Sequence, residues 1–567
     1  MKLYKFLFII FIISMIPLNY SCEDVLDKND LTGMASDLVW EDEAYIDAYV
    51  STLYFHLRGW VDSYTGGFRV MDDIADEGRS GYASFLPNSI MLPGLLTAEM
   101  DDQIHDMHYW QMYKEIRACN EFFSNMEHSS LDSKEIKTLT AEVRFIRAFH
   151  YFELVKRYGG VPLILKPQKL DDPEIFPARN TADECFSFIV DEFNQAAKTF
   201  EGFDIVNTNT ARAGQGAALA FKAKALLYYA SPQFNSGNDP QRWQDAANAA
   251  KAVIDLGVFN LDPDFSQICR RANDELIFKK EYKLHSNPSP WIKYDHGRST
   301  GYLPLSHARG DAGYSYPVQE FVDAFRMKNG LEISDGASGY DPKRPYQGRD
   351  PRFYSSVTYN GAVFMGDTVW TYVGSPPGTW GDGISANPFT TNTGYFCRKM
   401  IKEDLPDNYW GFRDDDTPYP FMRYADILLM YAEAENEASG PGANVVNSIQ
   451  QIWDRAGLTG NVPSGLSKDD MRTLIHNERY VELSFEEHRY WDLRRWDEAK
   501  TRLTGSKFHG MRITLDTLST APLVLDTIYT KVEIDIFVPE FKPYMNFLPI
   551  PYSEMLANPN LVQNPGW

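Results

Sequence analysis

The amino-acid sequence predicts a mainly α-helical protein in which a lobe of paired helices is joined to a loop-rich lobe with a few short strands. Two stretches with helical apolar periodicity, 141–158 and 211–254, predict the helical lobe. The stretch 283–410 lacks sustained periodicity and is rich in Gly, Pro, Tyr, Trp, Asn and Asp, which predicts a lobe of binding loops. No linker composition separates the lobes, so we expect one body over residues 22–567.

The most regular helix is expected between Ala141 and Tyr158. Its two apolar stripes are Phe145, Ala148, Phe149, Phe152 and Val155 on one side and Val143, Ile146, Tyr151 and Leu154 on another. A helix that is apolar on two sides packs between neighbouring helices. Gly159 and Gly160 then end the helix, and the chain continues in extended form.

Small residues dominate the next helical stretch. Eight alanines lie between 211 and 230, which lets helix backbones approach closely. Trp243, Ala246, Ala247, Ala250, Val253 and Ile254 follow at helical spacing, and an Asp-Pro comes after them at 262–263. Paired helices of this kind resemble tetratricopeptide (TPR) repeats. We therefore expect a TPR-like helical scaffold over about 40–280.

Helices resume after the loop-rich stretch, at 423–438 and again after Ser467. The scaffold is therefore expected to continue over about 420–500. Ser467 and Asp470 have the spacing of a capping box, and Leu466 can pack on Met471 as a hydrophobic staple. The last stretch, 532–567, contains Pro-rich turns and is expected to hold short strands.

The N-terminus predicts export and lipid attachment. Lys2 and Lys5 precede an apolar run of eleven residues over 6–16, and Cys22 follows shortly after it. This run is too short to cross about 30 Å of hydrocarbon, so we interpret residues 1–21 as a lipoprotein signal peptide. Cleavage would leave Cys22 as a lipidated N-terminus. The alternative is ordinary secretion, and Asn19 departs from the aliphatic residue usual at that position.

Charge and cysteine usage exclude several classes of function. The formal net charge is −23 and no run of Lys and Arg is present, which argues against a nucleic-acid partner. The cysteines after Cys22 are Cys119, Cys185, Cys269 and Cys397. They form no CxxC pair, which argues against a zinc knuckle or a redox motif, and we expect buried free thiols.

Five regions of the chain carry motifs that resemble one family when they are read together. They are CEDVLD at 22–27; AEVRFIRA at 141–148 with YFEL at 151–154 and YGGVPL at 158–163; RYADILLMYAEA at 423–434; ERYVELSFEEHRYWDLRRW at 478–496; and LPIP at 548–551 with NPNL at 558–561 and QNPGW at 563–567. In this order and over nearly the whole chain, they resemble the SusD/RagB family of outer-membrane nutrient-binding lipoproteins. Glu487 departs from the family, which often has glycine there.

The resemblance implies a SusD-like fold and a lipid-anchored place at the outer membrane, on the cell surface. It also implies a role without catalysis, in which the protein captures a nutrient and delivers it to a SusC-like TonB-dependent transporter. A large oligomer cannot diffuse through a porin, so a helical body would dock on the barrel while loops hold the ligand at its mouth. Glycan is the expected ligand, and peptide is the alternative within the same role.

Aromatic residues in loops are the candidate ligand contacts. A Trp or Tyr ring can stack on the C–H face of a sugar while polar side chains bind its hydroxyls, and the aromatic content is high at 14%. The resemblance implies loops in two regions, which contribute Trp60, Tyr64, Asp73, Arg79, Tyr82 and Phe85 from the first and Trp291, Tyr294, Tyr314 and Tyr316 from the second. The second region also contains Tyr302, Trp370 and Trp380 as further loop aromatics. Burial in the loop packing is the alternative for each of them.

A buried salt-bridge network is the interpretation of the charged motif at 478–496. Glu478, Glu482, Glu486 and Arg489 fall on one helical face, with Asp492 and Arg495 beyond them. Asp426 and Glu433 are likewise expected to pair with basic neighbours. The functional alternative is an acid/base pair of Glu486 and His488.

No motif predicts catalysis or a cofactor. HExxH, GxSxG, Walker-type loops and GxGxxG after a strand are absent from the sequence. We interpret the HxxH spacing of His105 and His108 as incidental and the run Asp414–Asp416 as a solvated turn, which leaves a structural Ca²⁺ as the one cofactor still open. The alternatives of other classes are a glycoside hydrolase, which needs two carboxylates in a cleft, and a TPR scaffold that binds protein helices.

Overall fold

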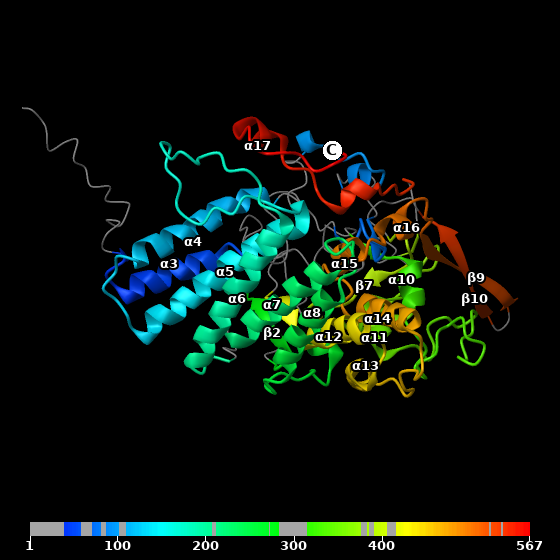
Figure 1. Cartoon of the computed structure of the whole chain (residues 1–567). Helices are drawn as coiled ribbons and strands as arrows, with labels where there is room; N and C mark the ends of the chain where they lie inside the picture. Colours follow the sequence, from blue (N-terminus) through cyan, green and yellow to red (C-terminus); the bar gives the residue numbers. More distant parts are fainter. Residues whose placement is uncertain are drawn as a thin grey trace, which may run out of the picture.

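The computed structural model describes residues 39–57, 71–80, 87–100, 109–206, 211–270, 273–282, 315–375, 383–384, 391–404, 416–520, 523–534 and 537–567. Helices dominate these ranges and the strands pair only in twos, so the predicted mainly helical fold is confirmed (Figure 1). Within the same ranges, no helix combines the length and the apolar character that crossing a bilayer requires.

The first part of the scaffold is a row of helices in which each helix packs on the next. These are α3 (Glu43–Phe55), α4 (Tyr113–Met126), α5 (Lys134–Tyr158), α6 (Ala182–Gly202), α7 (Gln215–Ala230) and α8 (Pro240–Ile254). In Figure 1 the row runs from blue to green across the molecule. Stacking of helices that are consecutive in sequence is the packing of a TPR-like scaffold.

Helix α5 packs between its neighbours because it is apolar on two sides. Phe145 and Ile146, one from each predicted stripe, are both 0% exposed. Ser133 caps the helix by accepting a hydrogen bond from the Ile136 N–H at 3.1 Å. Gly159 ends it with a φ of +73°, which glycine adopts without a Cβ clash. The predicted burial of both stripes is confirmed.

The chain leaves this row after α8 and returns to the same place. Strand β2 (Leu276–Lys280) leads out and strand β8 (Tyr419–Arg423) leads back, and the two pair antiparallel. Helix α12 (Tyr424–Ser439) follows β8 directly and packs on α8. The β2–β8 ladder therefore closes the base of the inserted lobe, and the helical row continues across it.

Shorter helices extend the row beyond α12. They are α13 (Ala443–Ala456), α14 (Lys468–Glu482), α15 (Arg489–Arg495) and α16 (Ala499–Leu503). Ser467 caps α14 by accepting a hydrogen bond from the Asp470 N–H at 3.1 Å, and its hydroxyl donates to the Asp470 carboxylate at 2.7 Å. Leu466 and Met471 pack in one apolar cluster. The Ser467 cap is confirmed, but the reciprocal bond from the Ser467 N–H to the Asp470 carboxylate, which would complete the predicted capping box, is not among the hydrogen bonds of the described residues. The shared cluster of Leu466 and Met471 agrees with the predicted staple.

The loop-rich lobe has an aromatic core of its own. Its described elements up to β8 are β3 (Tyr316–Pro317), α10 (Gln319–Ala324), α11 (Pro351–Ser356), β4 (Val357–Thr358), β5 (Ala362–Phe364), β6 (Asp367–Val369) and β7 (Phe396–Cys397). Phe321, Phe353 and Tyr395 are 0% exposed. Large flat side chains fill this core because such short elements present few regular apolar faces. Part of the high aromatic content thus serves packing.

The longest strands form a hairpin that the sequence patterns did not predict. Strands β9 (His509–Thr520) and β10 (Leu523–Glu533) pair antiparallel and project from one end of the molecule (Figure 1). After β10, the described residues contain a 3₁₀ turn at Pro543–Asn546 and helix α17 (Tyr552–Ala557), but no strand. The expectation of short strands over 532–567 is therefore wrong beyond Glu533, because the prolines of this tail cannot donate to a ladder.

The C-terminal tail is fastened to the first helical row. Arg179, in the loop before α6, donates hydrogen bonds to the carbonyls of Tyr158 and Val562 at 2.7 Å and to the Asn564 side-chain oxygen at 2.8 Å. At the last residue, the Trp567 Nε1–H donates to the Phe547 carbonyl at 3.0 Å. The terminal motif is therefore joined to the connection between α5 and α6.

The cysteines of the described chain are buried thiols, as expected. Cys119, Cys185, Cys269 and Cys397 form no disulfide with one another. Burial raises the pKa of the Cys185 thiol to about 11, so this thiol stays protonated and unreactive near neutral pH.

Candidate functional site

The two regions expected to carry the ligand meet at a short β-ladder. Strand β1 (Gly78–Arg79) belongs to the first region and β3 to the second, and they pair antiparallel with Arg79 opposite Tyr316. The segments approach closely, since a Cβ built on Gly78 would lie 2.4 Å from Ser315 Oγ. The described residues 71–80 and 315–317 therefore lie side by side, and we call these two segments the loop feet.

Three predicted contacts lie at these loop feet, and all three are buried. Asp73, Arg79 and Tyr316 are 3%, 3% and 0% exposed. Arg79 Nη1 donates to the backbone carbonyls of Asp73, Ala75 and Gly78 at 2.7–2.9 Å. Such bonds hold a turn in shape, so the structure gives these residues a supporting place, and their direct contact with a ligand stays a prediction.

Asp73 is also an unusual carboxyl group. Burial raises its pKa well above the ordinary value, although the nearby Ser315 hydroxyl and the charge of Arg79 act in the opposite direction. The side-chain oxygens of Asp73 and Ser315 both lie within 3.5 Å of a Cβ built on Gly78. Side chains of the two loop regions therefore lie together beside the β-ladder.

The other predicted site residues lie outside the described ranges. They are Cys22, Trp60, Tyr64, Tyr82, Phe85, Trp291, Tyr294 and Tyr314. Among the further loop aromatics, Trp370 is described and is 43% exposed.

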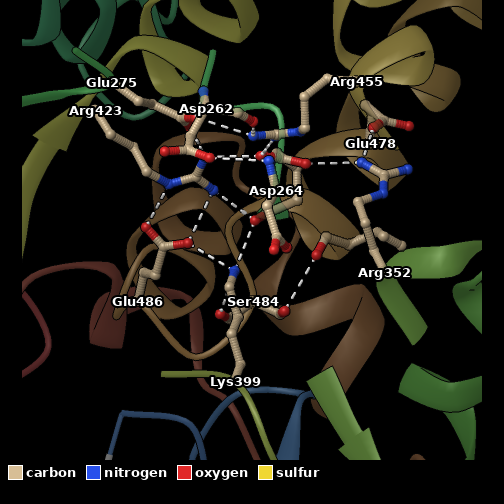
Figure 2. A network of polar contacts seen from close by, with 12 residues as sticks. Asp262, Asp264, Glu275, Arg352, Lys399, Arg423, Arg455, Glu478, Ser484 and Glu486 are labelled. Atoms are coloured by element: carbon tan, nitrogen blue, oxygen red, sulfur yellow. Dashed lines mark hydrogen bonds and ion pairs between the residues drawn. The ribbon is translucent and has the colours of Figure 1, made fainter. Parts of the chain in front are cut away.

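A buried network of ion pairs stands at the junction of the helical row and the inserted lobe (Figure 2). Arg423, the last residue of β8, is 1% exposed and forms its centre. Its Nη1 pairs with Glu275 and with Glu482, each at 2.7 Å, and its Nε pairs with Glu486 at 2.8 Å. Because these partners come from the residue before β2, from α14 and from the turn after α14, one side chain joins segments that are distant in sequence.

Arg352 brings the loop-rich lobe into this network. It lies on α11 and is 1% exposed. Its guanidinium pairs with Asp350 at 2.7 Å, with Glu482 at 2.8 Å and also with Glu478. Glu482 is therefore shared between an arginine of the inserted lobe and Arg423 of β8.

Lys399 and Arg455 complete the network. Lys399, after β7, pairs with Glu486 at 2.6 Å. Arg455, near the end of α13, pairs with Glu275 at 2.9 Å and contacts Glu482 as well. Separating a buried charge from its partners costs free energy, because the charge is then left unpaired in the interior. The network therefore holds the inserted lobe on the helical row.

The protonation states of this network do not suit acid/base catalysis. Burial by itself raises the pKa of Glu486, but the charges of Arg423 and Lys399 outweigh it and hold the pKa at about 2. Burial also lowers the pKa of His488 to about 3. Near neutral pH the carboxylate stays ionised and the imidazole stays neutral, so the two do not form an acid/base pair. The interpretation as a salt-bridge network is confirmed.

A second group of ion pairs continues along α12, α14 and α15. Arg479 pairs with Asp426 and with Asp492, each at 2.9 Å. Arg495 pairs with Asp492 at 2.8 Å and with Glu433 through two hydrogen bonds of 2.5 and 2.7 Å. The expectation that Asp426 and Glu433 pair with basic neighbours is confirmed.

The same helices tie down the loop foot that carries β1. Arg489 of α15 makes a two-point ion pair with Asp76, with both distances at 2.7 Å. The Phe485 N–H donates to the Glu77 carboxylate at 3.1 Å, and the Tyr480 hydroxyl donates to the Asp76 carbonyl. The first candidate ligand loop is thus rooted in the charged motif of 478–496.

Metal ligation has no support in the part of the chain that the structure describes. There, no group of three or more His, Cys, Asp or Glu side chains is arranged to hold an ion. Asp416 pairs with Lys402 at 2.5 Å. His105, His108, Asp414 and Asp415 lie outside the described ranges.

The sequence patterns missed half of the network. Arg352, Lys399 and Arg455 carry no motif, and Asp76 stands among several acidic residues. Their partners lie far away in sequence, so no local spacing pointed to them. The one local signal was that Lys399 is a charged residue within the loop-rich stretch, and this is a weak indication of an ion pair.

A TPR-like helical row, an inserted lobe with an aromatic core and two loop feet joined over buried ion pairs define the architecture of this protein. Comparison with known proteins places this architecture in a family. Residues 274–567 match the model of the SusD family, and residues 83–227 match the model described as "Starch-binding associating with outer membrane". The first match covers more than half of the chain, and the protein therefore belongs to the SusD family.

Individual relatives agree with this family over nearly their whole length. SusD-like protein P2 of Formosa agariphila is 26% identical over 597 residues, which cover 100% of each chain. A solved SusD-like carbohydrate binding protein from Bacteroides fragilis superposes with a TM-score of 0.76 at 22% identity, over 92% of this chain and 100% of that one. A solved laminarin binding SusD-like protein gives 0.63 at 20% identity, over 93% and 100%.

Proposed function

We propose that this protein is a lipid-anchored outer-membrane protein that binds oligosaccharides or polysaccharides at the cell surface and delivers them to a SusC-like TonB-dependent transporter. Membership of the SusD family is the observation that carries the proposal. The geometry supports it, because two candidate ligand loops start from one ladder over a rigid charged core. Loops that are held in place at their base lose less conformational entropy when they bind a ligand.

Carbohydrate is the ligand class that the comparisons favour. One matched family model is described by starch binding, and two solved relatives are described as carbohydrate binding and laminarin binding. Exposed rings beside polar groups suit the alternating C–H faces and hydroxyl rims of sugars. A peptide ligand in the same uptake role is the alternative.

The carboxylates of the buried ion-pair network support a non-catalytic role. Glu478, Glu482 and Glu486 are buried and paired with arginine or lysine, so they cannot act as a general acid in an open cleft. Incubation of the protein with polysaccharides should release no new reducing ends. Turnover that is lost when one carboxylate is replaced would instead establish a glycoside hydrolase.

Ligand capture should depend on the aromatics of the second loop region. Replacing Trp291 and Tyr294 together by alanine should weaken retention on the bound polysaccharide by about tenfold or more, because two stacking faces are removed. Glycan arrays identify the polysaccharide, and titration of the variant measures the loss. The matched control replaces two exposed aromatics of α3, Tyr45 and Phe55, and should bind as the parent does. Equal affinity of the Trp291/Tyr294 variant would exclude this loop as the contact surface.

The anchor and the partner have separate tests. Mass spectrometry of the protein purified from membranes should show a chain that starts at an acylated Cys22. A TonB-dependent barrel should co-purify with it in mild detergent. A chain that keeps residues 1–21, or a main partner other than a barrel, would contradict these two parts of the proposal.

A further inference from the structure

The β5–β6 hairpin presents an aromatic ring to solvent within the loop-rich stretch 283–410, at a distance in sequence from the predicted contacts at 291–316. Val363 pairs with Thr368 across the hairpin, and the alternate residues Ala362 and Val369 are buried. Val363 is 60% exposed and Trp370 is 43% exposed. One face of this hairpin therefore packs on the lobe, and the other faces outward.

Trp370 shares the outward face with Val363. The Gly361 N–H donates to the carbonyl of Val369, the partner of Ala362, at 2.8 Å, so the two chains stay together beyond the last ladder pair. Trp370 is two positions after Thr368, which is the partner of Val363. Positions two apart along a strand lie on the same face. A Cβ built on Gly361 would lie 3.8 Å from the indole ring, which places the ring beside a residue that has no side chain to cover it.

A polar cavity opens at the other end of this face. Its volume is about 600 Å³, which is within the range of small-molecule sites. Val363, Met365 and Gly366 of the hairpin form one wall. The charged side chains of the other walls are Arg270, Arg398, Lys402, Glu403, Asp404 and Asp416. Val363 thus belongs both to the outward face of Trp370 and to the cavity.

The charged groups of the cavity are held in place and balanced in sign. Arg398 grips Glu403 through two hydrogen bonds of 2.9 Å, and Arg270 reaches the same carboxylate at 3.2 Å. Lys402 pairs with Asp416 at 2.5 Å. Asp404 brings the formal balance of the described lining residues to three cations and three carboxylates. The Arg270 Nε–H is buried and has no hydrogen-bond partner among the described residues.

A balanced set of charges suits a ligand that is neutral and rich in hydroxyl groups. A uronate or a sulfated sugar would need surplus positive charge to offset its own. Guanidinium and carboxylate groups can instead bind neighbouring hydroxyls as donor and acceptor. The exposed indole face of Trp370 supplies the flat apolar surface on which a pyranose ring stacks.

We propose that Trp370, Val363 and the adjoining cavity of Arg270, Arg398 and Glu403 form a second glycan subsite, which takes neutral pyranose units of a chain. It rests on the proposed function, because it assumes that the protein binds glycan. It is separate in sequence from the loops of 60–88 and 291–316. A polysaccharide that contacts both sites is held more tightly than one that contacts either alone.

The test measures retention of the full-length mature protein on gels that contain laminarin, starch or galactomannan as neutral polymers and pectin or alginate as acidic ones. At least one neutral polymer should retain the parent protein. Trp370→Ala should weaken that retention at least about fivefold, through loss of the stacking face. Trp370→Phe should restore part of it, since a ring remains. The matched control is Tyr552→Ala, which removes a ring of similar exposure, 45%, on α17, and it should bind as the parent does.

The outcomes separate this subsite from the proposed function. Equal retention of the parent and Trp370→Ala, with equal melting temperatures, overturns the subsite and leaves glycan binding standing. Retention of the parent protein by the acidic polymers alone overturns the inference that the subsite takes neutral sugars. If no polymer retains the parent, the proposed function fails and the subsite fails with it. If Trp370→Ala melts early, Trp370→Phe is compared with the parent instead. Weaker retention of Trp370→Phe at an equal melting temperature supports the subsite, and equal retention overturns it.

Discussion

Arg423 shows how single residues stabilise this fold. It is 1% exposed and its guanidinium is surrounded by Glu275, Glu482 and Glu486. Removing Arg423 destabilises the fold mainly because three buried carboxylates would lose a shared partner. The attraction between Arg423 and these carboxylates is the smaller part of the effect, since burial of the charges opposes it.

Replacing Arg423 by alanine should therefore lower the free energy of unfolding by about 3–5 kcal/mol. Urea denaturation measures this loss. Lys251→Ala is the control, because Lys251 makes an ion pair with Asp255 whose side chains are 50% and 57% exposed, and it should leave the midpoint nearly unchanged. Equal losses in the two variants would contradict a special role for burial.

Glu487 carries backbone strain at the turn between α14 and α15. Its φ is +64°, in the left-handed region that favours glycine. This conformation explains why glycine suits the position, and Glu487 departs from that preference at the cost of strain. The Tyr419 hydroxyl donates to the Glu487 carboxylate at 3.0 Å, which partly offsets the strain.

Comparing Glu487→Gly with Glu487→Ala isolates this strain, since both variants lose the bond to Tyr419. The glycine variant should be the more stable by about 0.5–1 kcal/mol, because alanine keeps the Cβ clash. Thermal unfolding of the two proteins side by side measures the difference. The opposite order, which is normal in a helix, would show that the backbone here is not strained.

At the scale of elements, local signals set where the helices begin. Helix α6 starts with a capping box in which the Thr181 hydroxyl accepts from the Glu184 N–H at 3.2 Å and the Glu184 carboxylate accepts from the Thr181 N–H at 2.8 Å. This start fixes the direction in which the chain leaves the Arg179 loop, and so the place where the C-terminal tail attaches.

Thr181→Ala should cost about 1 kcal/mol of stability, because one N–H at the helix start loses its acceptor. Thr138→Ala is a matched control within α5. Its hydroxyl donates to the Lys134 carbonyl at 2.9 Å inside the helix, and alanine is the better helix former there. We expect the control to be neutral or slightly stabilising in the same urea titration, and equal losses would count against the cap.

At the scale of the whole molecule, buried carboxylates determine how stability depends on pH. Burial raises the pKa values of Glu153 and Glu486, but the neighbouring lysine and arginine charges outweigh it and hold both pKa values at about 2. The pKa values of Asp426, Glu482 and Asp492 are lowered in the same way. The folded protein therefore binds fewer protons than the unfolded chain below about pH 5.

The stability contributed by the lowered groups should thus be fully present above about pH 5 and fall steeply as the pH drops from 5 toward 2. Glu142, Asp73 and Glu77 act in the opposite direction, since burial raises their pKa values, that of Glu142 to about 7, but the lowered groups outnumber them. Thermal midpoints measured from pH 8 to pH 3 test this expectation. A midpoint that rises on acidification would contradict the ionised state of the network.

The fold was predictable from the sequence where the signal is local. Apolar periodicity found α5, α7, α8 and α12, and Ser467 marked the start of α14. The order of motifs along the chain pointed to the family. These features depend on residues within a few positions of each other, which a single sequence displays directly.

The tertiary structure alone decided the rest. The pairing of β2 with β8, the aromatic core of the inserted lobe, the β9–β10 hairpin and the place of Arg352 and Lys399 beside Glu482 and Glu486 all join residues that are distant in sequence. The burial of Asp73, Arg79 and Tyr316 belongs here as well. Whether a ring or a charge faces solvent depends on what the folded chain brings against it, and that information lies in long-range contacts that no local pattern contains.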